Sequence, residues 1–267
     1  MALWAHLKGY TRGAAIFAND VAAQNNVPTL LRGFARLGGT IVINESIAQD
    51  QSSYRAEIVR MLAARPQVIF MEGDPQSDAT YLVELKQLHG LLPMIGTAAT
   101  LQTQWLQAVT AVLGKKDFQK YWVGVQPYAA PSGPAWQVFD RALLDRRAAV
   151  PQASAYVADP WSMTDYDGAN IMALAMIATR STSPAVYNAA ILKITSPAPG
   201  TTKVYSFKQG EQALLAGKRI QYIGAGGPIL FNKYHNSLGA FESVTYGNGQ
   251  LPELGFMSAA QVAALNR

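Results

Sequence analysis

Residues 67–96, QVIFMEGDPQSDATYLVELKQLHGLLPMIG, decide the fold class. The stretch begins with a short apolar run, QVIFMEG (67–73), which predicts a buried strand. The next part, SDATYLVELKQLHG (77–90), has apolar residues at helical spacing and ends at Gly90. A second apolar run, LPMIG (92–96), follows it. A strand, a helix and a strand at this pitch form a βαβ unit, so the two strands should lie parallel in one sheet.

The same alternation continues on both sides of this unit. Three more strands are predicted at 13–18, 40–48 and 121–126, and three more helices at 27–38, 52–66 and 101–114. The strand cores are continuous apolar runs, which is typical of parallel strands that are buried on both faces. We therefore expect one parallel sheet with helices on both sides.

Polar residues that favour helix starts mark the expected boundaries of these helices. Asn26 is expected to cap the helix at 27–38, with Pro28 in its first turn. Ser52 or Ser53 is expected to cap the helix at 52–66.

The chain changes character after residue 126. Amphipathic or apolar helices are predicted at 135–149, 164–181 and 183–194, and Thr164 or Asp165 is the expected cap of the second. Residues 159–161, DPW, have the composition of a linker. A closing strand is expected at 241–250.

The composition excludes several classes of function. The chain has 267 residues, of which 49% are hydrophobic and 15% charged, as in a globular protein with one large domain or two smaller ones. It has no cysteine, so disulfides and thiolate chemistry are excluded. The net charge of +5 is scattered, so nucleic acid is not an expected partner. The apolar part of the first residues is too short for a secretory signal.

No pattern of catalytic or metal-binding residues is recognisable. The three histidines, His6, His89 and His235, are too far apart for a local metal signature, and no G-x-S-x-G motif is present. Glu72 and Asp74 are the only close acids at a predicted strand end, and we expect a strand end and a turn residue there. We therefore expect a protein that is not an enzyme, with no metal and no cofactor.

The glycine-rich stretch YIGAGGPILFN (222–232) could be a phosphate-binding loop or a turn. A dinucleotide fingerprint needs G-x-G-x-x-G between a strand and a helix. Here the glycines are spaced G-A-G-G-P, and the residues that follow have no helical pattern. This favours a turn, and it leaves a Rossmann-like enzyme as the less favoured alternative.

Three segments together resemble a known family. Residues 222–250 resemble the C-terminal signature of type 1 periplasmic solute-binding proteins of the branched-chain amino acid (Leu/Ile/Val) group, with Asn232 in place of the family's aspartate. TDYDGANIMALAMIATRS (164–181) is similar to a family helix that opens with Y-D-A. Residues 9–96 are similar to the start of the family's second lobe. The resemblance covers nearly the whole chain.

The resemblance implies an α/β fold with one complete three-layer lobe and one incomplete lobe. Residues 1–158 and 240–267 would form the complete ligand-binding lobe, and residues 160–239 part of the other one. Because family members have about a hundred residues before this point, we expect a piece of a longer chain or a partner that supplies the missing half. The apolar helix at 168–178 would then lack its sheet, and its exposed face would favour self-association.

The resemblance also implies a function. The chain would be an extracytoplasmic receptor of an ABC uptake system, periplasmic or anchored at the cell surface, and its partner would be the membrane permease. Two lobes would close by a hinge on a small organic molecule, amino-acid-like or related. A cytoplasmic ligand-sensing domain of the same architecture is the alternative.

The resemblance places ligand contacts in the cleft between the lobes. The candidate ligand-binding residues are Asn19, Asp20, Asp74, Thr97, Tyr128 and Trp161. The acid that binds an α-amino group in the family aligns with Ala98, which weakens the amino-acid interpretation unless Asp74 substitutes for it. Each candidate also has a structural interpretation, such as turn formation by Asp74 or packing by Trp161.

Overall fold

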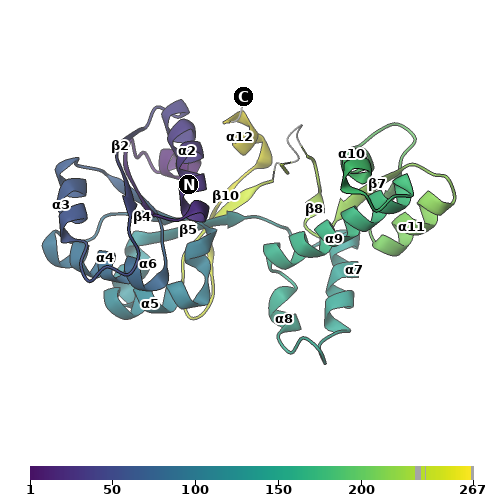
Figure 1. The fold of residues 1–267 in the computed structure, drawn as a ribbon. Helices are drawn as coiled ribbons and strands as arrows, with labels where there is room; N and C mark the ends of the chain where they lie inside the picture. Colours follow the sequence, from purple (N-terminus) through teal and green to yellow (C-terminus); the bar gives the residue numbers. More distant parts are fainter. Residues whose placement is uncertain (232–235, 238, 266–267) are drawn as a thin grey trace. The chain divides into compact units, whose positions relative to one another are not determined.

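The computed structural model describes residues 1–231, 236, 237 and 239–265. It divides into two compact units (Figure 1). Unit 1 consists of Met1–Gln126 and Phe241–Arg267, and unit 2 consists of Pro127–Ala240. The sequence-based expectations for Asn232 and His235 lie outside the described residues.

Unit 1 contains a seven-stranded sheet in the order β10-β9-β5-β4-β3-β1-β2. The strands are β1 (Arg12–Ala18), β2 (Thr40–Ile47), β3 (Val68–Glu72), β4 (Met94–Gly96), β5 (Trp122–Pro127), β9 (Phe241–Val244) and β10 (Glu253–Met257). The pairs β2–β1, β1–β3, β3–β4 and β4–β5 are parallel, and β9–β10 is antiparallel. The prediction of an α/β fold with a parallel sheet is confirmed.

Helices cover both faces of this sheet. They are α1 (Ala2–Leu7), α2 (Val21–Arg36), α3 (Arg55–Ala63), α4 (Pro75–Leu88), α5 (Thr103–Leu113), α6 (Lys115–Tyr121) and α12 (Ala259–Ala264), with a 3-10 turn η1 (Ala98–Leu101) after β4. Successive strand residues point to opposite faces. Ile16 and Met71 therefore join the core with Trp105, whereas Phe17 and Phe70 join the core on the other side. The result is the predicted three-layer arrangement, with α2 and α12 on one side of the sheet and α4, α5 and α6 on the other (Figure 1).

The prediction for the start of α2 was wrong. The helix begins at Val21, because the Asp20 side chain accepts a hydrogen bond from Ala23 N at 2.9 Å and so caps it earlier. Asn26 and Pro28 consequently lie inside the helix. The Asn26 side chain instead donates to Glu72 Oε2 at 2.8 Å.

Two other helices also start at residues that the sequence did not indicate. At the start of α3, Tyr54 N donates a hydrogen bond to Glu84 Oε2 at 2.6 Å. A carboxylate from α4 therefore caps α3, and neither Ser52 nor Ser53 is its N-cap. Helix α9 (Pro160–Thr179) is capped by Asp159, which accepts from Ser162 N at 2.7 Å, and not by Thr164 or Asp165.

Unit 2 combines helices with a three-stranded sheet. The helices are α7 (Gly133–Leu144), α8 (Ala153–Tyr156), α9, α10 (Pro184–Thr195) and α11 (Phe207–Leu215), and the strands are β6 (Thr202–Val204), β7 (Ile220–Gly224) and β8 (Gly227–Pro228). β6 and β7 are parallel, and β8 is antiparallel to β7.

The expectation that the helix at 168–178 lacks a sheet is wrong. Leu174 of α9 is fully buried and shares a core with Val204 of β6 and Tyr222 of β7. Ile171 and Ala175 are buried in the same core. One face of this helix therefore has a core of its own. Met172 of the same helix is 46% exposed, and self-association stays a prediction.

The division between the units differs from the sequence-based boundary near residue 158. Phe139 of α7 is 3% exposed and packs with Met163 and Ala225, both of unit 2. Trp136 Nε1 also donates to Val157 O at 2.7 Å. Because α7 and α8 make these contacts, residues 127–158 fold with unit 2.

The glycine-rich stretch forms a hairpin turn between β7 and β8. Ile223 pairs with Pro228 and Gly224 with Gly227. Asp167 of α9 holds the turn, since its Oδ1 accepts from Tyr222 Oη at 2.8 Å and from Ala225 N at 2.9 Å. The interpretation as a turn, in place of a phosphate loop, is confirmed.

Candidate functional site

The carboxyl ends of β1, β3 and β4 lie side by side in unit 1. Phe17 of β1 is in register with Glu72 of β3, and Met71 of β3 with Gly96 of β4. The loops that follow these strands therefore emerge at one edge of the sheet, which is where parallel α/β sheets bind their ligands. Four of the predicted site residues, Asn19, Asp20, Asp74 and Thr97, belong to these loops.

Asn19 and Asp20 follow β1 directly. Asn19 N donates to Ile47 O at 2.8 Å, and the residue is exposed. Asp20 uses both carboxylate oxygens, since Oδ1 caps α2 and Oδ2 accepts from Gln49 Nε2 at 2.9 Å. Asp20 thus fixes the loop after β1 while its carboxylate stays at the surface.

Asp74 caps α4. Its Oδ1 accepts from Gln76 N at 3.0 Å and from Ser77 N at 2.9 Å, and Pro75 fills the first helical position. Its Oδ2 is buried and has no hydrogen-bond partner. Oδ1 of Asp74 therefore has the predicted role of a turn residue, whereas Oδ2 accepts no hydrogen bond.

Thr97 caps the 3-10 turn after β4. Its Oγ1 accepts from Ala99 N at 3.3 Å, and Thr97 N donates to Met71 O at 3.4 Å. Thr97 is half-buried, so its side chain is accessible at the same edge of the sheet.

Two further acids lie beside Asp74. Glu72, the last residue of β3, is 8% exposed, and Asp78, in the first turn of α4, is fully buried. Trp105 Nε1 donates to Asp78 Oδ2 at 2.7 Å. Asp78 Oδ1 lies so close to Gly73 that a Cβ there would be 2.3 Å from it, and the Gly73 backbone donates a hydrogen bond to this carboxylate.

The pKa of Asp78 is raised to about 7, mainly because burial penalises the charged carboxylate. The hydrogen bonds from Trp105 and from the Gly73 backbone lower it, whereas the negative charges of Asp74 and Glu72 raise it further. Sequence reasoning interpreted Glu72 as a strand end and did not single out Asp78. The occurrence of three acids between residues 72 and 78 is the feature of the sequence that could have indicated Asp78.

We expect the free energy of unfolding of unit 1 to fall as the pH rises from about 4 to 7. Between the unfolded pKa of Asp78, near its ordinary value of 3.8, and the folded pKa of about 7, only the folded state holds this proton. Raising the pH through this window therefore favours unfolding, by at most about 4 kcal/mol, and the effect is complete above the folded pKa. Urea unfolding followed by circular dichroism would measure it.

Asp78→Asn should remove this slope, and Asp117→Asn should keep it, because Asp117 is a partly exposed acid of unit 1 that pairs with Lys86. An unchanged slope in Asp78→Asn would contradict the assignment.

Tyr128 and Trp161 belong to unit 2. Tyr128 is half-buried, and its N donates to Ala240 O at 2.9 Å. Trp161 lies in the first turn of α9 and is 48% exposed. The structure thus brings four of the candidates together in unit 1 and places these two in unit 2.

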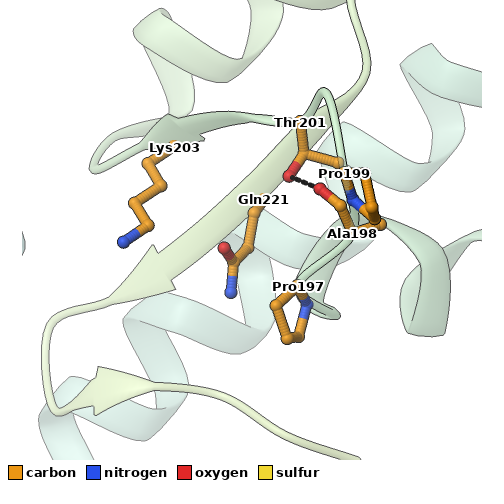
Figure 2. Close-up of a pocket in the computed structure, with 6 residues that line it drawn as sticks. All are labelled: Pro197, Ala198, Pro199, Thr201, Lys203 and Gln221. Atoms are coloured by element: carbon orange, nitrogen blue, oxygen red, sulfur yellow. Dashed lines mark hydrogen bonds between the residues drawn. The ribbon is translucent and has the colours of Figure 1, made fainter.

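Two hollows lie away from the candidate residues. One, of about 430 Å³ in unit 2, is lined by Pro197, Ala198, Pro199, Thr201, Lys203 and Gln221 (Figure 2). Its loop is closed by a hydrogen bond from Thr201 Oγ1 to Ala198 O at 2.7 Å. The other, of about 310 Å³ in unit 1, lies between β2 and α3 and includes Glu45 and Arg60.

Among the described residues, no group of three or more histidine, aspartate or glutamate side chains is placed to hold a metal ion. In the same part of the chain, no helix has the length and apolar character needed to cross a membrane.

The fold of this chain matches solved structures of one kind. Over 97% of this chain, the structure is similar to a leucine-binding protein from Thermotoga maritima, with a TM-score of 0.66 and 14% identity. The chain has the fold of a type 1 periplasmic solute-binding protein. The similarity in fold extends along nearly the whole sequence.

Two further structures of the type 1 fold have different ligands. A solute-binding protein of an ABC transporter from R. palustris, in complex with 4-hydroxybenzoate, matches 100% of this chain with a TM-score of 0.62 and 14% identity. A branched-chain amino acid binding protein from Streptococcus pneumoniae, in complex with isoleucine, matches 96% with a TM-score of 0.58 and 14% identity. These neighbours are binding proteins and not enzymes.

This chain spans 64%, 66% and 62% of the lengths of these three proteins. No family model matches the sequence. No curated protein matches it either.

Proposed function

We propose that the chain acts in a solute-binding receptor of an ABC uptake system, outside the cytoplasm, and that it delivers a small organic molecule to a membrane permease. The observation that carries this proposal is the type 1 fold over 97% of the chain. The polar edge formed by the loops after β1, β3 and β4 supports it, because this is the binding edge of such sheets. Catalysis is not part of the proposed role.

The proposed mechanism is closure about a hinge. The chain passes from unit 1 to unit 2 after Gln126 and returns after Ala240, so only two connections join the units. Ligand affinity would come from groups that meet only in the closed form. Asp74, Thr97, Asn19 and Asp20 are the proposed contacts from unit 1, and Trp161 and Tyr128 those from unit 2.

A ligand screen with the full natural chain tests this function. The panel contains leucine, isoleucine, benzoate, 4-hydroxybenzoate and a set of aliphatic amines. We expect at least one compound to bind saturably and to raise Tm, since a ligand at about 100 times its Kd stabilises the folded state by about 2.7 kcal/mol. A screen in which no compound shifts Tm, or in which a bound compound is chemically converted, would count against the proposal.

Trp161→Ala should weaken binding of that compound about tenfold, which corresponds to about 1.4 kcal/mol. It should leave the Tm of the unliganded protein nearly unchanged, because Trp161 is 48% exposed. Tyr156→Ala is the matched control, since Tyr156 of α8 is an aromatic residue of similar exposure, 41%.

A further inference from the structure

The hollow of about 430 Å³ in unit 2 lies on the outer face of strands β6 and β7 (Figure 2). Val204 of β6 and the β7 residues Ile220 and Tyr222 are buried in the helical core of unit 2. Successive residues of a strand point to opposite faces, so Lys203 and Gln221 point away from that core. They are in register across the two strands, and both line the hollow. This cross-strand pair therefore forms one wall of the hollow.

The other wall is the loop before β6, which is lined by Pro197, Ala198, Pro199 and Thr201. Two hydrogen bonds to carbonyl groups hold this loop in place. Thr201 Oγ1 donates to Ala198 O at 2.7 Å, and Arg219 Nη2 donates to Pro199 O at 2.7 Å. Proline has a fixed φ and no N–H group, so the two proline rings give this wall a stiff, apolar surface.

Gln221 supplies a buried amide that has no partner. It is 7% exposed, and its side chain makes no hydrogen bond to any residue that the structure describes. A carboxamide has two N–H donors and an acceptor oxygen, and buried polar groups in proteins are nearly always hydrogen-bonded. Figure 2 shows this amide in the hollow, between the side chains of Lys203 and Pro197. A molecule in the hollow would therefore meet a donor that the protein itself leaves unused.

The surroundings of the hollow are basic. Lys203 is exposed, and neither Lys203 nor Arg219 belongs to an ion pair among the described residues. Between residues 193 and 219 the only acid is Glu211. The same stretch contains five basic residues, Lys193, Lys203, Lys208, Lys218 and Arg219. An unpaired ammonium beside an unused N–H donor favours an anion, because hydrogen bonds in which a partner is charged are the stronger ones.

We propose that this hollow binds a small organic carboxylate, at a site of its own in unit 2. The Lys203 ammonium and the Gln221 amide would donate to the carboxylate, and Pro197 and Pro199 would contact its apolar part. The proline wall favours a carboxylate with an apolar body over a bare inorganic anion, because small-molecule sites combine apolar walls with a few placed polar groups. This inference goes beyond the proposed receptor function, since it concerns a second site and does not depend on what the loops of unit 1 bind.

Nuclear magnetic resonance on the full natural chain, labelled with ¹⁵N, tests this site. The probes are benzoate and hexanoate, and the comparison compounds are benzamide, which has the same ring without the charge, and inorganic phosphate. We expect a carboxylate to shift saturably the side-chain amide signals of Gln221 and the backbone amides between residues 198 and 204. Added salt should weaken this binding, because the exposed Lys203 ammonium is screened by ions.

Two variants assign the binding to the proposed groups. Lys203→Gln should weaken carboxylate binding about tenfold, and Gln221→Met, which keeps the length of the side chain and removes its amide, about fivefold. Lys208→Gln is the matched control, since Lys208 is an exposed lysine of unit 2 that does not line the hollow. Unshifted signals from the helical core of unit 2 would show that each variant is folded.

Four results would overturn the inference. They are no shift with either carboxylate, shifts confined to the loops of unit 1, binding that is unchanged in Lys203→Gln and Gln221→Met, and binding of benzamide or phosphate as strong as that of the carboxylates. None of them would contradict the proposed receptor function, because that function is tested by ligands of the loops of unit 1 and by Trp161→Ala.

Discussion

Trp105→Ala should lower the free energy of unfolding of unit 1 by about 5 kcal/mol. Trp105 is 1% exposed, and its ring centroid lies 5.8 Å from that of Trp122 and 6.1 Å from that of Phe118. Alanine would leave a cavity among these rings, and it would also remove the hydrogen bond that the indole donates to the buried Asp78 carboxylate. Urea unfolding followed by far-ultraviolet circular dichroism would measure the loss.

Trp105→Phe separates the two contributions, since it keeps a ring in the core and removes the indole donor. We expect about half of the loss for this variant. Trp161→Phe, at an exposed tryptophan, should change stability by less than about 0.5 kcal/mol. A value for Trp105→Ala within about 1 kcal/mol of the unsubstituted protein would show that this core is not built around Trp105.

Asp167→Ala should destabilise unit 2 by about 3 kcal/mol and loosen the turn between β7 and β8. Asp167 is 4% exposed, and its removal leaves two buried donors, Tyr222 Oη and Ala225 N, without their acceptor. Faster hydrogen exchange at the Ala225 amide is the most direct measurement, because that proton is held by Asp167 alone among the described contacts.

Asp165→Ala is the matched control for this variant. Asp165 lies on the same helix and is exposed. Its loss should change the free energy of unfolding by less than about 0.5 kcal/mol. It should leave the exchange rate of the Ala225 amide unchanged. Unchanged exchange at Ala225 in Asp167→Ala would contradict the role assigned to the carboxylate.

The parallel sheet was predictable because its strands are continuous apolar runs between amphipathic helices. The helix starts were less predictable, because several residues near each start can act as caps. Asp20 and Asn26 are both suitable caps for α2, and the choice depends on where β1 ends. At α3 the capping group is Glu84, which comes from another helix and carries no local signal.

The short elements of unit 1 escaped prediction for a related reason. Helix α6, KKDFQKY, buries only Phe118, so its sequence has the character of a solvated segment. Strand β10 exists because Glu253–Met257 pairs with β9, a contact that no local pattern encodes.

The position of the candidate site followed from topology, since parallel sheets bind at their carboxyl edge. The pKa values and hydrogen bonds of the side chains at that edge could not be predicted from topology. The pKa of Asp78 is raised because the folded chain buries its carboxylate, whereas its sequence position indicates only an ordinary acid in a helix. Likewise, Asp74 is correctly predicted as a turn residue, and only the folded chain shows that one of its oxygens has no partner.

The insertion of unit 2 into unit 1 has a consequence for synthesis on the ribosome. Strands β1 to β5 are made before unit 2, but the sheet gains β9 and β10 only after all of Pro127–Ala240 has been translated. Met257 of β10 belongs to the same core as Trp4 of α1, so this core is complete only after Met257 has been made. Until then the nascent chain exposes the edge of β5 and the apolar groups beneath α1. Unit 2 can fold in that interval, whereas unit 1 completes its sheet only once β9 and β10 have been made.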